Sequence, residues 1–506
     1  MTAPVARHLR VDEPAGRWVV LATVLGSALT FLDATVVNIA LPQIGEDLDA
    51  DLGDLQWTLN GYTLTLASFI LLGGSLGDRF GRRRVFVAGT IWFAVASALC
   101  AAAPTVEVLV LARALQGIGG ALLTPGSLAI ISASFAGEDR SRAIGAWSGL
   151  GGIAGAVGPF VGGWLIEVGS WRWVFLANIP LAAVVVLVAV RHVPESFDPT
   201  ASHRLDLPGA ALGALGLAGI TYASIAAGER GLDPLVVTTG AAGVLALLAF
   251  VLVERRSDHP LVPPSLFESR QFTMTNVVTF VIYAAFGAVF FLLVLQLQVV
   301  SGFSPLAAGT ALLPVTLLLL VLSPRAGALS SRIGPRLPMT VGPLLAAVGL
   351  LLMMRIGPDA SYLTDVLPGV VVFGLGLALL VAPLTSTVLA AAAPEHAGAA
   401  SGVNNAVART GSLLAVAMLP ALVGLTGDVY RDPEAFSSGF QMAILICAGL
   451  LVLGGVLSAV FISDDVGKVT PDAERPEVEH CYSCPVDGPH LETVRPAAAG
   501  SGGTRS

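Results

Sequence analysis

The segment GSLGDRFGRRR at residues 74–84 lies between two long apolar stretches, and it decides how the chain is organised. A second segment, GALSSRIGPR at residues 327–336, repeats its Gly, Leu, Arg, Gly and Arg at the same offsets 253 residues later. Ser331 stands in the second copy where Asp78 stands in the first. A loop that recurs between apolar stretches indicates an internal duplication, so the sequence predicts two related halves.

The chain is far more apolar than a soluble domain. Of its 506 residues 55% are hydrophobic and 12% are charged, and the mean hydropathy is +0.80, whereas soluble domains carry about 25% charged residues. A bilayer core about 30 Å thick is crossed by a helix of about 20 apolar residues. Fourteen stretches have this length, which predicts an all-α polytopic membrane protein. They are 18–41, 55–76, 85–103, 108–132, 143–168, 173–190, 207–227, 234–253, 274–300, 305–322, 337–354, 363–389, 398–425 and 440–462.

The repeat divides these spans into two halves, with spans seven and eight inserted between them. From residue 463 the sequence is rich in Pro, Glu, Ala and Gly, which predicts a disordered tail. The predicted parts are an N-terminal segment (1–17), a six-helix bundle (18–190), two inserted helices with their linkers (191–273), a second six-helix bundle (274–462) and the tail (463–506).

Lys and Arg are unequally distributed between the two sides of the predicted bilayer. With an even number of spans both termini share a side, and 21 of the 25 Lys and Arg residues outside the spans fall on it. The positive-inside rule therefore predicts that both termini are cytoplasmic. The net charge of −8 comes largely from loops and the tail, and it indicates no nucleic-acid partner.

Asp33, Arg113 and Arg409 are almost the only charged residues within the spans. At 1.5 Å per residue, Asp33 lies about 12 Å and Arg113 about 8 Å from the outer ends of their helices. Their similar depth and opposite charge predict an ion pair. A charge within a membrane is costly and is more often functional than incidental. The pair is either a structural contact or a proton-coupling device in which Asp33 titrates.

Several segments resemble motifs of the major facilitator superfamily. The loop at residues 74–84 resembles the signature of that superfamily, and LVLARALQGIGGA at 109–121 resembles its fourth-helix motif. LDATVVNIALP at 32–42 and SWRWVFLANIP at 170–180 resemble the branch of drug:proton antiporters with fourteen spans. The resemblance covers residues from about 18 to 462. It implies a major facilitator fold of two six-helix bundles plus two inserted helices.

The resemblance also implies a conformational latch in the first loop. Its glycines allow a tight turn, and Asp78 can accept from backbone N–H groups at the start of span thirteen when the cytoplasmic side is closed. Because Ser331 carries no charge, we expect a weaker latch in the second copy. The expected latch residues are Gly74, Asp78, Arg79, Gly81, Arg82 and Arg83.

Span five resembles the motif that marks exporters in the superfamily. Glycines four residues apart share one face of a helix and let another helix approach closely. The alternative is a helix interface with no meaning for the direction of transport. The residues of this motif are Gly155, Gly158, Pro159, Gly162 and Gly163.

The substrate cavity is expected to be largely apolar, with a few polar groups. Such a cavity suits amphipathic or hydrophobic compounds better than sugars. Arg409 lies about 16 Å into span thirteen, near the midplane, where it binds either helix carbonyl groups or an anionic part of the cargo. Trp171 and Trp173 are interpreted as an aromatic anchor at the membrane interface, with contact to the substrate as the alternative. The candidate cavity residues are Asn38, Gln116, Gln296, Gln298, Asn405 and Arg409.

The tail segment HCYSCPVDGPH, residues 480–490, contains Cys481 and Cys484. Its sulfur and imidazole groups make a weak zinc candidate. No metal or other cofactor is expected for the transport itself, which a proton gradient would drive.

The sequence therefore predicts a monomeric secondary transporter of a prokaryotic cell membrane, which exchanges protons for amphipathic or hydrophobic small molecules such as drugs or antibiotics. A proton symporter or importer of the same fold, or an exporter of a lipid or natural product, is the alternative. A membrane enzyme would need a cluster of His, Asp or Glu within the spans, and Asp33 is the only such residue deep in them.

Overall fold

The computed structural model describes residues 9–198, 205–257, 260–392 and 397–464, and these residues form helices and connecting loops without a strand. The first helices along the chain are α1 (Pro14–Asp47), α2 (Leu52–Phe80), α3 (Arg82–Ala102), α4 (Val106–Ser134), α5 (Gly137–Val168), α6 (Arg172–Leu176) and α7 (Asn178–His192). The inserted pair is α8 (Leu207–Arg230) and α9 (Pro234–Arg256). The remaining elements are η1 (Pro264–Glu268), α10 (Arg270–Leu295), η2 (Gln296–Val300), α11 (Pro305–Ala311), α12 (Leu313–Ile333), α13 (Arg336–Met353), η3 (Tyr362–Val366), α14 (Leu367–Ala390), α15 (Ala397–Leu422), η5 (Gly427–Arg431) and α16 (Pro433–Phe461).

The helices have the length and composition that a membrane requires. Among the described residues, 13 helices are long and apolar enough to cross a bilayer. The remaining predicted span corresponds to α5, which runs for 32 residues and ends in the apolar stretch Val157–Val168. Several helices are longer than the apolar stretches predicted from the sequence, since polar residues at their ends are also helical. The all-α membrane fold predicted from the sequence is therefore confirmed.

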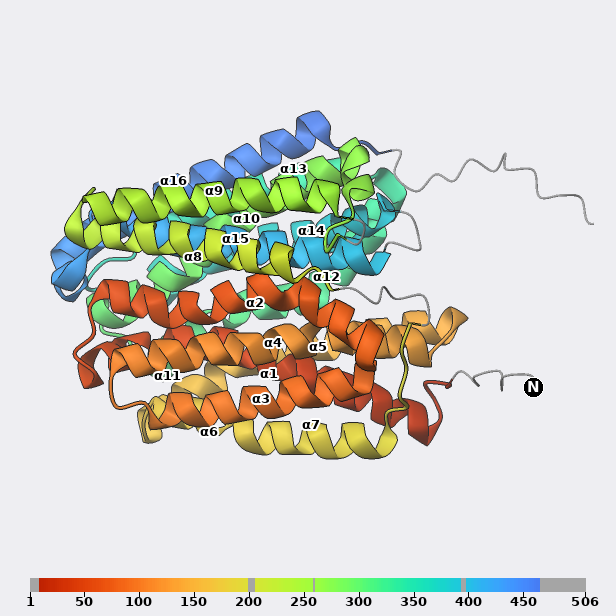
Figure 1. Cartoon of the computed structure of the whole chain (residues 1–506). Helices are drawn as coiled ribbons and strands as arrows, with labels where there is room; N and C mark the ends of the chain where they lie inside the picture. The colour runs from red at the N-terminus through yellow and green to blue at the C-terminus, as the bar shows by residue number, and fades with distance from the viewer. Residues whose placement is uncertain (1–8, 199–204, 258–259, 393–396, 465–506) are drawn as a thin grey trace, which may run out of the picture. The chain divides into compact units, whose positions relative to one another are not determined.

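The helix contacts fall into two sets, with the inserted pair beside them. In the first set α4 packs against α2 and α3, and α1 packs against α5 and α7. In the second set α10 packs against α15 and α16, and α14 packs against α12 and α13. The pair α8 and α9 pack on each other, and α8 also contacts α2 and α15 (Figure 1).

The repeated loop makes the same turn in each set. Gly81 ends α2 and precedes α3 with φ of 108°, and Gly334 ends α12 and precedes α13 with φ of 89°. These backbone angles lie in the region that glycine adopts without steric cost. The turn explains why glycine recurs at this offset in both copies.

A carboxylate then binds each repeated turn from the end of its own set. The N–H of Arg83 donates to Glu195 Oε1 at 3.0 Å, and the N–H of Arg336 donates to Asp464 Oδ1 at 3.0 Å. Glu195 follows α7 and Asp464 follows α16, so each set is closed on itself by an acid beyond its last helix. We call these two contacts the carboxylate clasps. A carboxylate at a helix N-terminus satisfies free N–H groups and interacts favourably with the helix dipole.

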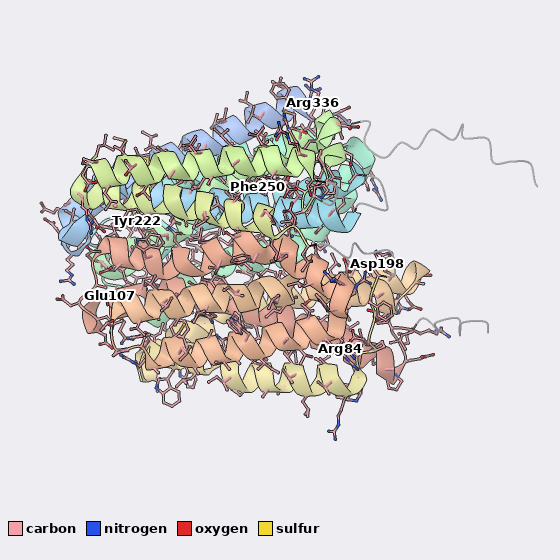
Figure 2. All side chains as sticks on the ribbon, in the orientation of Figure 1. Arg84, Glu107, Asp198, Tyr222, Phe250 and Arg336 are labelled. Carbon is pink, nitrogen blue, oxygen red and sulfur yellow. The ribbon has the colours of Figure 1, made fainter. Side chains whose placement is uncertain are left out.

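The two ends of the helices differ in charge. Figure 2 shows Arg84, Asp198 and Arg336 at one end and Glu107 at the other. We call the first the arginine-rich end, because both copies of the repeated loop lie there, and the second the arginine-poor end.

Removal of either clasp should destabilise its set. We expect Glu195→Ala and Asp464→Ala each to lower the free energy of unfolding by about 1 kcal/mol, the usual contribution of a helix cap. Chemical denaturation of the purified protein in detergent measures this change, with the exposed Glu268→Ala as control. Unfolding midpoints equal to that of the control would contradict a stabilising role.

Candidate functional site

The centre of the first helix set holds a fully buried ion pair. Arg113 Nη1 on α4 contacts Asp33 Oδ2 on α1, and the two side chains are 1% and 0% exposed. The pair predicted from depth and charge is thus present in the structure. Two charges removed from water are stable only if other groups satisfy their remaining hydrogen-bonding capacity.

Amide side chains of α4 and α7 satisfy the remaining hydrogen-bonding capacity of Asp33. Gln116 Nε2 donates to Asp33 Oδ1 at 2.8 Å, and Asn178 Nδ2 donates to the same oxygen at 3.2 Å. Both amides also reach Ser97 Oγ on α3, at 2.9 Å and 3.3 Å. The carboxylate therefore accepts from an arginine and two amides.

Arg113 is held equally closely. Its Nε donates to the backbone oxygen of Thr58 on α2 at 3.1 Å. The guanidinium lies 4.4 Å from the ring centre of Tyr62 and 5.8 Å from that of Phe175. Cation–π contacts of this kind stabilise a desolvated arginine. The pair thus joins α1, α2, α3, α4 and α7 in one network.

The sequence reasoning missed Ser97 and Asn178. Asn178 lies in the segment at residues 170–180, which was interpreted as an aromatic anchor. That interpretation is wrong for Trp171, which is 0% exposed and donates from Nε1 to Asp47 Oδ2 at 2.9 Å, whereas Trp173 is 55% exposed. The sequence offered one signal for Asn178, namely that it is a polar residue at the start of an otherwise apolar helix.

A cavity of about 310 Å³ lies beside the ion pair, between the two helix sets. Its wall is formed by residues of α1, α2, α4, α5, α10, α12 and α15, and Arg113 itself is part of it. Three lining residues have buried polar atoms without a hydrogen-bond partner in the described structure, namely Asn38 Oδ1, Asn60 Nδ2 and Tyr62 Oη. The other polar or aromatic residues of the lining include Thr35, Thr63, Tyr283, Phe286, Phe290, Thr316, Arg409 and Ser412.

Four of the six polar residues proposed for the cavity lie elsewhere. Gln116 binds Asp33, and Gln296 is buried with its Nε2 donating to the oxygen of Ile356 at 2.8 Å. Asn405 donates back to the oxygen of Ser401 on its own helix. Helix rotation decides these outcomes, and the spacing of isolated polar residues in the sequence does not reveal it. The residues that do not line the cavity are Gln116, Gln296, Gln298 and Asn405, whereas Asn38 and Arg409 do.

Hydrogen bonds between the two helix sets lie toward the arginine-poor end. Gln298 Nε2 donates to the oxygen of Ile39 at 3.0 Å, immediately beyond the cavity wall. Within the described residues, no such bond joins the sets at the arginine-rich end. Other bonds of this kind include Gln56 Nε2 to the oxygen of Ala417 (3.2 Å), Ser304 Oγ to Glu167 Oε2 (3.3 Å) and Arg431 Nη2 to Asp49 Oδ1 (3.2 Å).

The loop expected to act as a latch binds within its own set in this arrangement. Asp78 Oδ1 pairs with Arg82 at 2.8 Å, and Arg83 donates from Nη1 to the oxygen of Val193 at 3.1 Å. Asp78 has no hydrogen bond to α15 among the described residues. Gly74 lies near Pro125 of α4, and Arg79 lies over the ring of Phe80 at 4.8 Å. The latch contact with span thirteen thus stays a prediction for a different arrangement of the sets.

The glycines of α5 lie at close helix contacts. A Cβ at Gly158 would meet Thr35 Oγ1 at 2.7 Å, and one at Gly162 would overlap Val36, so both glycines face α1. A Cβ at Gly163 would lie 2.7 Å from Leu306 Cα of α11, in the second set. Pro159 lines the cavity. The surroundings of Gly155 lie outside the described residues.

The zinc candidates Cys481 and Cys484 also lie outside the described residues. The two remaining cysteines, Cys100 and Cys447, are buried and free. Cys100 lies next to the network, with its Sγ 3.7 Å from Gln116 Oε1.

Comparison with known sequences identifies the same family along most of the chain. The family model of the Major Facilitator Superfamily matches residues 23–416. The puromycin resistance protein of Streptomyces alboniger is 38% identical over 484 residues, which cover 92% of this chain and 96% of that protein. The tetracenomycin C resistance and export protein of Streptomyces glaucescens is 35% identical over 418 residues, which cover 82% of this chain and 77% of that protein.

Solved structures share the fold at low sequence identity. An auto-inhibited POT family peptide transporter has a TM-score of 0.66 at 17% identity and covers 88% of this chain and 96% of its own. A bacterial homologue of the human lysosomal transporter Spinster, inward-facing and unoccupied, has a TM-score of 0.61 at 18% identity, with coverage of 88% and 97%. These likenesses concern the fold alone.

Asp33 and Arg113 should stabilise each other in the folded protein. We expect Arg113→Ala to lower the free energy of unfolding by about 3–5 kcal/mol, because a buried carboxylate loses its counter-charge. The double variant Asp33→Asn/Arg113→Ala should recover part of this loss. Denaturation of the wild type, both single variants and the double variant in detergent measures the coupling. Strictly additive effects would show that the two charges do not stabilise each other.

Proposed function

This chain belongs to the Major Facilitator Superfamily, a family of transporters rather than enzymes, and we propose that it exports amphipathic or hydrophobic small molecules in exchange for protons. The observation that carries the proposal is Asp33, a titratable group buried against Arg113, and Arg113 lines a cavity between the two helix sets. An ionisable residue within a membrane span marks an ion or proton pathway by default.

The relatives support the direction and the class of cargo. They are named for resistance to puromycin and for resistance to and export of tetracenomycin C, and both are matched over more than two thirds of their length. We extend export of antibiotic-like molecules to this chain on that basis. The cavity agrees with such cargo, because aromatic and aliphatic side chains form more than half of its wall and polar groups are interspersed among them, as an amphipathic molecule requires.

The chain is a multi-pass protein of the plasma membrane. In the proposed orientation the arginine-rich end and both termini are cytoplasmic, as the distribution of Lys and Arg favours. The hydrogen bonds at the arginine-poor end then close the outside of the cavity, and cargo enters from the cytoplasm. Export requires a second arrangement, in which these bonds break and the arginine-rich ends of the sets approach each other.

Asp33 would link this movement to the proton gradient. A proton from outside neutralises Asp33, so Arg113 loses its counter-charge and the hydrogen bonds from Gln116 and Asn178 weaken. A free-energy difference of about 5.5 kcal/mol moves a two-state balance from 1:99 to 99:1. Part of that free-energy difference can come from the buried ion pair, because Asp33 loses and regains its charge in each cycle. Release of the proton to the cytoplasm restores the pair.

Asp33→Asn tests the proposed function. It removes the titratable group at nearly constant volume, so we expect proton-coupled export to fall at least tenfold while the amount of folded protein stays near normal. In inside-out vesicles with an acidic lumen, cargo added to wild-type protein should make the lumen more alkaline, and Asp33→Asn should abolish this change. Glu268→Gln, an exposed acid, is the matched control. Acidification of the lumen by cargo would indicate symport and contradict the proposal.

Asp78→Ala tests the latch. If Asp78 meets the N-terminus of α15 when the cytoplasmic side closes, its loss removes about 0.3–2 kcal/mol from that state. We expect slower turnover and a population shift toward the arrangement described here. Labelling of single cysteines on each face of the membrane measures the shift, with Ser331→Ala as the control at the equivalent uncharged position. Labelling ratios equal to those of the wild type would rule out the latch.

A further inference from the structure

The cavity contains a second arginine that the proposed proton cycle does not use. Arg113 and Arg409 are the two charged residues of the cavity lining. Arg113 is paired with Asp33, whereas Arg409 has no ion pair and no hydrogen bond among the described residues. No carboxylate lines this cavity to balance the charge.

The position of Arg409 makes its lack of a partner significant. It lies 12 residues into α15, about 18 Å along the helix, and is therefore near the middle of the bilayer. Among the described residues its guanidinium binds no helix carbonyl, which is the structural alternative to binding cargo. A permanently charged group is costly at this depth, and such a group commonly faces a water-filled path and marks where an ion or a charged substrate passes.

Aromatic residues line the same cavity as this charge. Tyr283, Phe286 and Phe290 come from α10, and Tyr62 comes from α2. Asn38 Oδ1 and Asn60 Nδ2 add an acceptor and a donor that have no partner. The wall thus combines one free cation, aromatic surfaces and two unsatisfied amide atoms, a set that fits an aromatic molecule with an acidic group.

We propose that Arg409 binds an anionic group, a carboxylate or an ionised phenol, of an aromatic cargo. This inference rests on the proposed export function and narrows its substrate class. A guanidinium is suited to a carboxylate because two parallel N–H groups can donate to its two oxygens. The anion supplies the charge that the cavity lacks, and the rings of α10 contact the apolar body.

One consequence is electrical. If one proton enters for each monoanion that leaves, two positive charges move inward per cycle, whereas a neutral cargo moves one. The membrane potential, negative inside, would then drive anion export more strongly than export of a neutral analogue. Currents per transported molecule on a solid-supported membrane should differ twofold between the two cargoes.

The test compares anthracene-2-carboxylate with its neutral methyl ester as probes. We expect the wild-type protein in nanodiscs to bind the acid at least tenfold more tightly than the ester at pH 7.5, measured by fluorescence titration. Arg409→Gln should abolish this preference by weakening the acid alone, and Arg409→Lys should retain part of it. Arg325→Gln, which removes an exposed arginine of α12, is the matched control.

The outcomes separate this inference from the export function. Equal binding of acid and ester by the wild type, binding of neither, or an equal loss of both in Arg409→Gln would overturn the anion site. The comparison within the wild type does not depend on whether a variant folds. Proton-driven efflux of the ester without preference for the acid would leave export intact and reject the anion site. Preference for the acid without proton-driven efflux of either probe would support the anion site and reject proton-driven export.

Discussion

The contact between Asp33 and Arg113 constrains the rest of the first helix set. Its two charges are tolerable in the bilayer only because polar groups of other helices bind them, the Thr58 oxygen of α2 at Arg113 and Asn178 of α7 at Asp33. Ser97 of α3 holds the network indirectly, because it accepts from the two amides that bind Asp33. Five helices must therefore keep their rotation and depth for one pair to remain satisfied. In the proposed cycle, neutralisation of Asp33 acts on all of them together, and a single proton thereby influences the arrangement of the whole set.

The second helix set completes the cavity beside the ion pair. It closes the cavity through hydrogen bonds at one end, including that of Gln298 to the oxygen of Ile39, and it contributes Arg409 to the cavity wall. Glycines make the contact between the sets close, as Gly163 does against Leu306. The proposed proton site thus lies within the first set, whereas the proposed cargo site takes groups from both sets. In the proposed cycle, coupling between them passes through the interface between the sets.

The sequence predicted the features that depend on length, charge and repetition. Apolar stretches of fixed length gave the helices, depth along a helix paired Asp33 with Arg113, and the repeated glycines located the two turns. It failed where the outcome depends on helix rotation. Gln116 and Gln296 turn away from the cavity because each finds a buried partner, and Asn178 turns toward Asp33 although its neighbours suggested a surface role. No linear pattern encodes which side of a helix meets which neighbour when polar residues are isolated.

The carboxylate clasps carry a consequence for how such a chain can change over generations. Glu195 and Asp464 each tie the end of a set to that set's own third membrane span, α3 or α13, so neither half needs the other to fix where it ends. Additional sequence between the halves then disturbs few existing contacts, as is true of insertions at exposed boundaries in general. A gene that encodes two self-closed units can thus gain a helical hairpin such as α8 and α9 at the junction, and both units keep their structure.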